Sequence, residues 1–145
     1  MGNAAEFLAE FNSQYKAQND VYRNLAKRFG ISESVFWILY FLSFNGGTMP
    51  QKDICTAMYL PKQTTNSALK KLESAGVISM SRSKSRCKDV SLTPEGKEIA
   101  ERTVDRALAA ELRTMEELTE EEQREFLRIF NKYNNKLSKR FGEIK

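Results

Sequence analysis

The chain has 145 residues, a net charge of +4 and 41% hydrophobic residues, which suits one small domain or a small domain with added oligomerisation helices. It has no histidine, which excludes Ser-His-Asp triads, Cys-His pairs and every zinc site that uses histidine. Its two cysteines, Cys55 and Cys87, form no metal-ligand spacing. No apolar run approaches the roughly 20 residues that span a membrane, and the amino terminus lacks a signal-peptide pattern. We therefore expect a cytoplasmic protein with no membrane partner, metal or cofactor.

A long amphipathic helix is predicted over residues 4–28, and Gly30 ends it. Its aromatic and aliphatic residues recur at a spacing of three to four, which gives more apolar surface than a small domain covers. We expect this helix to pack on the carboxy-terminal helices or on a partner chain. The recurring residues are Phe7, Phe11, Tyr15, Tyr22 and Leu25.

The second predicted helix begins after Ser32, which suits an N-cap. Residues 35–42 follow almost without a polar break, and a helix that is apolar on nearly every side is buried on nearly every side. We therefore predict a central core helix that includes Trp37.

A short third helix is predicted over residues 50–58, after a loop at residues 45–47. Thr48 and Gln51 fit a capping box, and Pro50 then lies in the first turn. A tight connection leads directly into a fourth helix, which is the order of a helix-turn-helix.

The fourth helix, within Leu60–Gly76, holds the polar side chains that could contact a ligand. Pro61 suits the first helical position and Gly76 suits a left-handed cap. Asn and Gln can bond an adenine edge, Lys can reach guanine or phosphate, and Ser can do either. The alternative explanation is an ordinary solvated helix face. The side predicted to face the core holds Thr65, Ala68, Leu69, Leu72 and Ala75, and the opposite side holds Gln63, Asn66, Ser67 and Lys70.

A basic hairpin follows this helix. Residues 77–82 and 90–92 read as its strands, and the polar segment 83–88 is its tip. Residues 61–90 hold seven basic and two acidic residues, whereas the remainder of the chain carries a net charge of −1. The positive excess therefore lies where a phosphate-binding surface is expected, although a solvated hairpin tip would also be polar. The basic residues of the tip are Lys84, Arg86 and Lys88.

Two more helices complete the chain. Thr93 and Pro94 suit the N-cap and first position of an uninterrupted helix over residues 94–117. A second capping box at residues 119–122 begins the last helix, which runs to about residue 140. With residues 4–28, these are three amphipathic helices whose apolar stripes need a partner surface, and packing across a two-fold axis would supply it.

Three runs of the sequence resemble those of the MarR family of transcriptional regulators. They are Pro61–Glu73, Gly76–Ile78 and Leu92–Gly96, and the last two frame the hairpin. The order of one helix, a winged helix and two helices is similar too. The resemblance implies a mainly α fold, in which a winged helix-turn-helix with a small β-hairpin wing is flanked by amino- and carboxy-terminal helices that form a dimerisation domain. The expected domains are 1–30 (dimerisation), 31–94 (DNA binding) and 95–145 (dimerisation).

The same resemblance implies a homodimer that binds a short palindromic operator in double-stranded DNA. Binding there would most simply block a promoter and make the protein a repressor, and activation through the same contacts is the alternative. The fourth helix would enter the major groove, and Arg86, by its position before Leu92, matches the arginine that enters the minor groove. Lys84 stands where the family usually has an Asp that pairs with this arginine. Many members are released from DNA by a small aromatic or phenolic effector. We expect phosphate contacts from Lys62, Lys70, Lys84 and Lys88, and base contacts from Gln63, Thr64, Asn66 and Ser67.

The sequence leaves two other classes of function open. One is a winged helix that binds a protein partner and no DNA. The other is an enzyme that uses Cys87 or a carboxylate pair, but no residue spacing supports it, so we expect no enzyme. A redox-sensing role for Cys87 rests on its basic neighbours, since cations favour a thiolate. The peroxide sensors of the family carry their reactive cysteine in the amino-terminal helix, where this chain has none.

Overall fold

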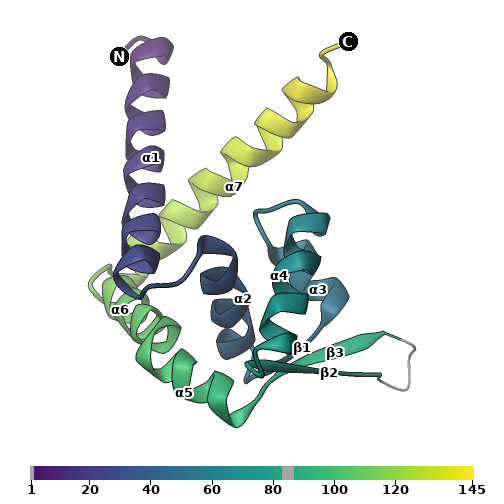
Figure 1. Cartoon of the computed structure of the whole chain (residues 1–145). Helices are drawn as coiled ribbons and strands as arrows, with labels where there is room; N and C mark the ends of the chain where they lie inside the picture. Colours follow the sequence, from purple (N-terminus) through teal and green to yellow (C-terminus); the bar gives the residue numbers. More distant parts are fainter. Residues whose placement is uncertain (1, 83–86) are drawn as a thin grey trace. The chain divides into compact units, whose positions relative to one another are not determined.

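The computed structural model describes residues 2–82 and 87–145, which fall into two compact units, Met1–Arg106 and Ala107–Lys145. The first unit holds α1 (Ala4–Arg28), α2 (Glu33–Phe44), β1 (Thr48–Pro50), α3 (Gln51–Ala57), α4 (Lys62–Ser74), β2 (Ile78–Arg82), β3 (Lys88–Leu92) and α5 (Pro94–Arg102) (Figure 1). Helix α6 (Val104–Glu116) begins in the first unit and ends in the second, which also holds α7 (Glu120–Gly142). The predicted class, a mainly helical winged helix with a small sheet, is confirmed.

Helix α1 has the predicted bounds. The side chain of Asn3 accepts a hydrogen bond from the Ala5 backbone N–H at 3.0 Å and caps the helix. Near its other end, Arg23 Nε donates to Glu33 Oε1 at 2.7 Å, which ties α1 to α2. Much of its apolar side is uncovered, notably Phe7, Leu8, Tyr15 and Val21.

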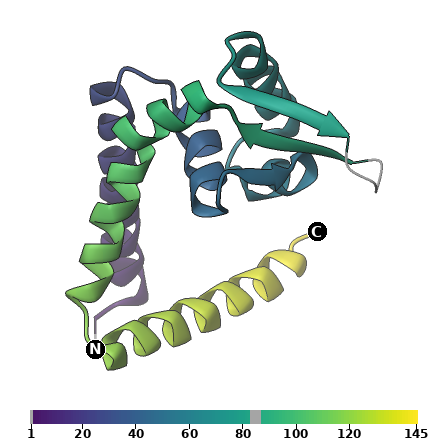
Figure 2. The same ribbon diagram turned by 90° about the horizontal axis from the view of Figure 1, so that it is seen from below.

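Helix α2 lies at the centre of the first unit, beside α3, α4 and the sheet (Figures 1 and 2). Its Ser32 cap is confirmed, since Ser32 Oγ accepts from the Val35 N–H at 3.2 Å. The prediction of burial on nearly every side is wrong. Trp37 is only half-buried, although its ring contacts those of Tyr22 on α1 and Tyr59 in the connection between α3 and α4. The side chains buried by α2 are Phe36, Ile38, Leu39 and Leu42.

Helices α3 and α4 form the predicted helix-turn-helix. Pro61 is the N-cap of α4 and not its first helical residue, and its carbonyl accepts from the Thr65 N–H at 3.0 Å. Gly76 has φ +74°, so the predicted left-handed cap is confirmed. The chain therefore turns sharply from α4 into the wing.

The wing belongs to a three-stranded antiparallel sheet in the order β1-β3-β2. Strand β1 was not predicted: Thr48 pairs with Ser91, and their hydroxyl oxygens lie 2.9 Å apart. The predicted Thr48–Gln51 capping box is therefore wrong. Pro50 is the N-cap of α3, and no side chain caps that helix. Three residues that include a proline give no strand periodicity, so only pairing with β3 defines this strand.

Thr93 and Gly96 join the wing to α5. Thr93 Oγ1 accepts from the Gly96 N–H at 3.0 Å, as predicted for an N-cap, and donates to the Val77 carbonyl at 3.0 Å. A side chain at Gly96 would overlap that same carbonyl oxygen. The spacing of Thr93 and Gly96 thus has a packing reason, because α5 crosses the base of the wing at backbone contact.

The predicted uninterrupted helix over residues 94–117 is wrong, because it breaks between α5 and α6. Thr103 has φ −126° and ψ −94°, which is not helical. Its buried hydroxyl donates to the Ile99 carbonyl at 2.7 Å, and its N–H bonds the Ala100 carbonyl. Such side-chain bonding to a carbonyl four residues earlier competes with the helical ladder.

In the second unit, α7 begins at the predicted capping box, which is confirmed. Thr119 Oγ1 accepts from the Glu122 N–H at 3.1 Å, and Glu122 Oε2 accepts from the Thr119 N–H at 2.8 Å. No residue of α7 is buried. Its exposed apolar side chains include Phe126, Leu127, Ile129, Phe130 and Phe141.

Across the described residues, the model contains no helix that combines the length and the apolar character needed to cross a membrane.

Candidate nucleic-acid interface

Helix α4 presents a polar side to solvent because its other side is anchored in the core. The side chains of Thr65, Ala68, Leu69 and Leu72 are buried, as predicted. Ala75 is exposed, so its predicted place on the core side is wrong: it lies at the C-cap, where the helix has already ended. The exposed residues of the opposite side are Lys62, Gln63, Thr64, Ser67 and Lys70.

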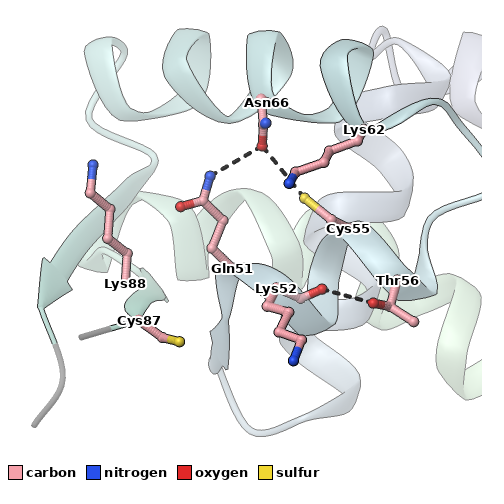
Figure 3. A pocket seen from close by; sticks show the side chains of 8 residues that line it. All are labelled: Gln51, Lys52, Cys55, Thr56, Lys62, Asn66, Cys87 and Lys88. Atoms are coloured by element: carbon pink, nitrogen blue, oxygen red, sulfur yellow. Dashed lines mark hydrogen bonds between the residues drawn. The ribbon is translucent and has the colours of Figure 1, made fainter. Parts of the chain in front are cut away.

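Asn66 differs from its neighbours on this face, because it is half-buried against α3. Its Oδ1 accepts from Gln51 Nε2 at 3.1 Å and from Cys55 Sγ at 3.5 Å. The prediction that Asn66 lies on a fully outward side is therefore wrong in part. Its side chain is shared between the surface and a contact with the preceding helix (Figure 3).

A pocket of about 520 Å³ lies between α3, the start of α4 and the start of β3 (Figure 3). Its lining includes three lysines and no carboxylate, so its electrostatic character favours an anion. These lysines are Lys52, Lys62 and Lys88. The remaining lining residues are Gln51, Cys55, Thr56, Asn66 and Cys87.

Sequence reasoning missed the contribution of α3 to this surface. Gln51 and Cys55 are four residues apart, so they share a side of α3, and that side meets Asn66. The polar residues of the first turn of α3 were a signal of a solvent-facing site. Cys55 is only half-buried and lines this pocket.

Within the wing, the described cations lie at the far end of its strands, next to the tip. Lys88 and Arg82 are exposed and face each other in the β2–β3 register. Cys87 is exposed beside them. The predicted contacts Lys84 and Arg86 lie outside the described residues.

Within the described residues, no ion pair neutralises the cations of this surface. Among the described ion pairs, none engages Lys52, Lys62, Lys70 or Lys88. The pairs that shift pKa values lie on other elements: a hydrogen bond from Lys16 lowers the pKa of Asp20, and one from Arg128 lowers the pKa of Glu125. The lysines around α4 therefore keep their charge available for an anionic partner.

The geometry matches that of known regulators. Residues 29–86 match the sequence model of the MarR family, and this segment spans α2, the helix-turn-helix and the first wing strand. No curated protein sequence matches the chain.

Solved structures extend the likeness to nearly the whole chain. A MarR family regulator from Neisseria meningitidis is 21% identical, with a TM-score of 0.80 over 95% of this chain and 98% of the other. A MarR/EmrR family regulator from Acinetobacter sp. ADP1 is 24% identical, with a TM-score of 0.67 over 96% and 99% of the two chains. A MarR family protein from Mycobacterium tuberculosis, in complex with p-aminosalicylic acid, is 25% identical, with a TM-score of 0.55 over 92% and 99%.

Proposed function

We propose that this chain, whose residues 29–86 match the MarR family of transcriptional regulators, binds a short palindromic operator as a homodimer and represses the adjacent promoter. The family is one of regulators and not of enzymes. The observation that carries the proposal is the polar, exposed side of α4, which stands next to unneutralised lysines on α3 and β3. A helix with this side fits the major groove of DNA.

Each predicted residue has a role in this proposal. The lysines attract phosphates regardless of sequence, which makes binding salt-dependent. The hydroxyl and amide side chains contact base edges, and Arg86 reads the width of the minor groove. The phosphate contacts are Lys62, Lys70, Lys84 and Lys88, and the base contacts are Gln63, Thr64, Asn66 and Ser67.

The homodimer is supported by uncovered apolar side chains at both ends of the chain. Phe7 is 74% exposed on α1, and Phe126 is 63% exposed on α7. Exposed apolar surface of this extent is typical of a protein interface. We propose that segments 1–30 and 95–145 pair with a second copy, which would set two α4 helices about 10 base pairs apart, or a multiple of that spacing.

The proposal also includes an aromatic or phenolic effector that releases the DNA. The half-buried ring of Trp37 lies 5.1 Å from that of Tyr22 on α1 and 5.3 Å from that of Tyr40, so stacking partners for an aromatic molecule are at hand. The Mycobacterium tuberculosis protein with the same fold was solved with an aromatic acid, p-aminosalicylic acid.

Selection of bound duplexes from a random pool, with the purified full-length chain, tests the proposal. We expect a palindromic consensus and a dimer by light scattering. A monomer that retains no duplex at low salt would refute it and favour the alternative, a winged helix that binds only protein. Release of the selected duplex by p-aminosalicylic acid tests the effector.

A further inference from the structure

The base that Asn66 reads depends on which end of its side-chain amide faces the DNA. The carbonyl oxygen Oδ1 faces α3, where Gln51 Nε2 lies at 3.1 Å and Cys55 Sγ at 3.5 Å. A carbonyl oxygen has two lone pairs, and here two donors are directed at it. The amide nitrogen Nδ2 donates to no residue in the described part of the chain, so its two N–H groups remain for a ligand.

The opposite orientation of the amide is less favourable. It would direct the Asn66 N–H groups at the sulfur of Cys55, which is a weak acceptor. It would also leave the thiol without its oxygen acceptor, which lies 3.5 Å from Sγ. Gln51 can bond either orientation by turning its own amide, so the thiol of Cys55 is the contact that selects between them.

From these contacts we propose that Gln51 and Cys55 are positioning residues that make Asn66 a hydrogen-bond donor, so that it selects guanine over adenine. Asparagine binds adenine by accepting from N6 and donating to N7, and this requires a free Oδ1. Guanine instead presents two adjacent acceptors, O6 and N7, in the major groove. The inference rests on the proposed function, because it assigns a base preference to α4.

The base in question is found by comparing two selections from a random duplex pool. One uses the wild-type chain and the other uses Asn66→Ala, and the position at which the preference is lost is the one that Asn66 reads. Fluorescence anisotropy then measures the affinity for matched duplexes with guanine, adenine or 7-deazaguanine at that position. For the wild-type chain we expect guanine to exceed adenine by roughly fivefold or more, which is the size of one good base contact. Replacing guanine N7 with carbon should remove most of that margin.

Variants of α3 test the positioning role. Gln51→Ala together with Cys55→Ala frees Oδ1, so we expect the preference for guanine to fall at least fivefold or to pass to adenine. Cys55→Ser, with Gln51 unchanged, keeps a hydroxyl donor. We expect it to retain more of the guanine preference than the double variant does. The matched control Gln14→Ala removes a glutamine on α1 that bonds Glu10, and the preference should not change. Circular dichroism melting of each variant shows whether it is folded.

The outcomes separate this inference from the proposed function. If the wild-type chain binds no duplex, both are refuted. If it binds a palindrome but prefers adenine at this position, or if the folded α3 double variant keeps the wild-type preference, only the positioning role is refuted. An Asn66→Ala variant that keeps every base preference also refutes the inference alone, because Asn66 then reads no base.

Discussion

Helices α4 and α7 both expose side chains to solvent, but the chemistry of the exposed side chains is opposite. Around α4 the exposed groups are amides, hydroxyls and lysines without carboxylate partners. Along α7 the exposed groups include four phenylalanine, leucine or isoleucine side chains within residues 126–130. Water solvates the first side well and the second side poorly. Exposure alone therefore does not distinguish the two helices, whereas unneutralised charge beside hydrogen-bonding side chains does, and this difference supports the proposal that α4 contacts DNA.

The largest expected effect comes from placing charge on the exposed apolar side chains of α7. Phe126 and Phe130 are stacked with ring centroids 5.9 Å apart, and replacing both with Glu places charge in the proposed dimer interface. We expect a monomer by light scattering and an affinity for the palindrome that falls by about 100-fold or more, because the two half-sites are no longer bound together. Lys132→Glu adds the same charge to another side of α7 and should leave the dimer intact. A dimer that survives the double substitution would contradict the assignment of α7 to the interface.

The second-largest effect on DNA affinity is expected from substitutions of the proposed base contacts on α4. Gln63→Ala or Asn66→Ala should weaken binding to the selected duplex by about 1–3 kcal/mol and relax the preference at one base pair. Binding to unrelated duplexes should change little, because phosphate contacts remain. Anisotropy titrations with the selected and a scrambled duplex measure both quantities. Equal losses on the two duplexes would mean that these residues contact phosphate.

Lysine substitutions should act on all duplexes alike. Lys62→Ala with Lys88→Ala should lower the slope of log affinity against log salt by about 3.6, since the proposed homodimer loses four phosphate contacts and each contributes about 0.9. Lys84→Ala should likewise weaken all DNA to a similar degree. The matched pair Lys16→Ala with Lys27→Ala, on α1, should leave the slope unchanged. A loss confined to the selected duplex would contradict a phosphate role.

The smallest effect tests the buried side of α4. Thr65 is fully buried, and its hydroxyl has no hydrogen-bond partner among the described residues. Thr65→Val has nearly the same shape without that hydroxyl, so we expect the free energy of unfolding to rise by about 1 kcal/mol. Urea denaturation measures the change, and DNA binding should be unaffected. A destabilised variant would mean that the hydroxyl is satisfied in solution.

Local signals in the sequence predicted most helices. The bounds of α1, the Ser32 and Thr93 caps, the left-handed Gly76 and the capping box at Thr119 depend on residues within a few positions of each other. The lysines of α4 and its exposed side followed from helical periodicity. Half-burial of Trp37 was not predictable, because it depends on how closely Tyr22 and Tyr59, from distant segments, approach its ring.

What the sequence by itself determined was the helical order, the caps and the concentration of positive charge in residues 61–90, since each arises from neighbouring residues. Only the tertiary structure decided which distant groups meet. Thr48 pairs with Ser91, 43 positions away, and Asn66 meets Gln51 and Cys55, which are 15 and 11 positions away. The physical reason is that strand pairing and amide orientation are properties of two segments in contact, and neither segment carries that information alone.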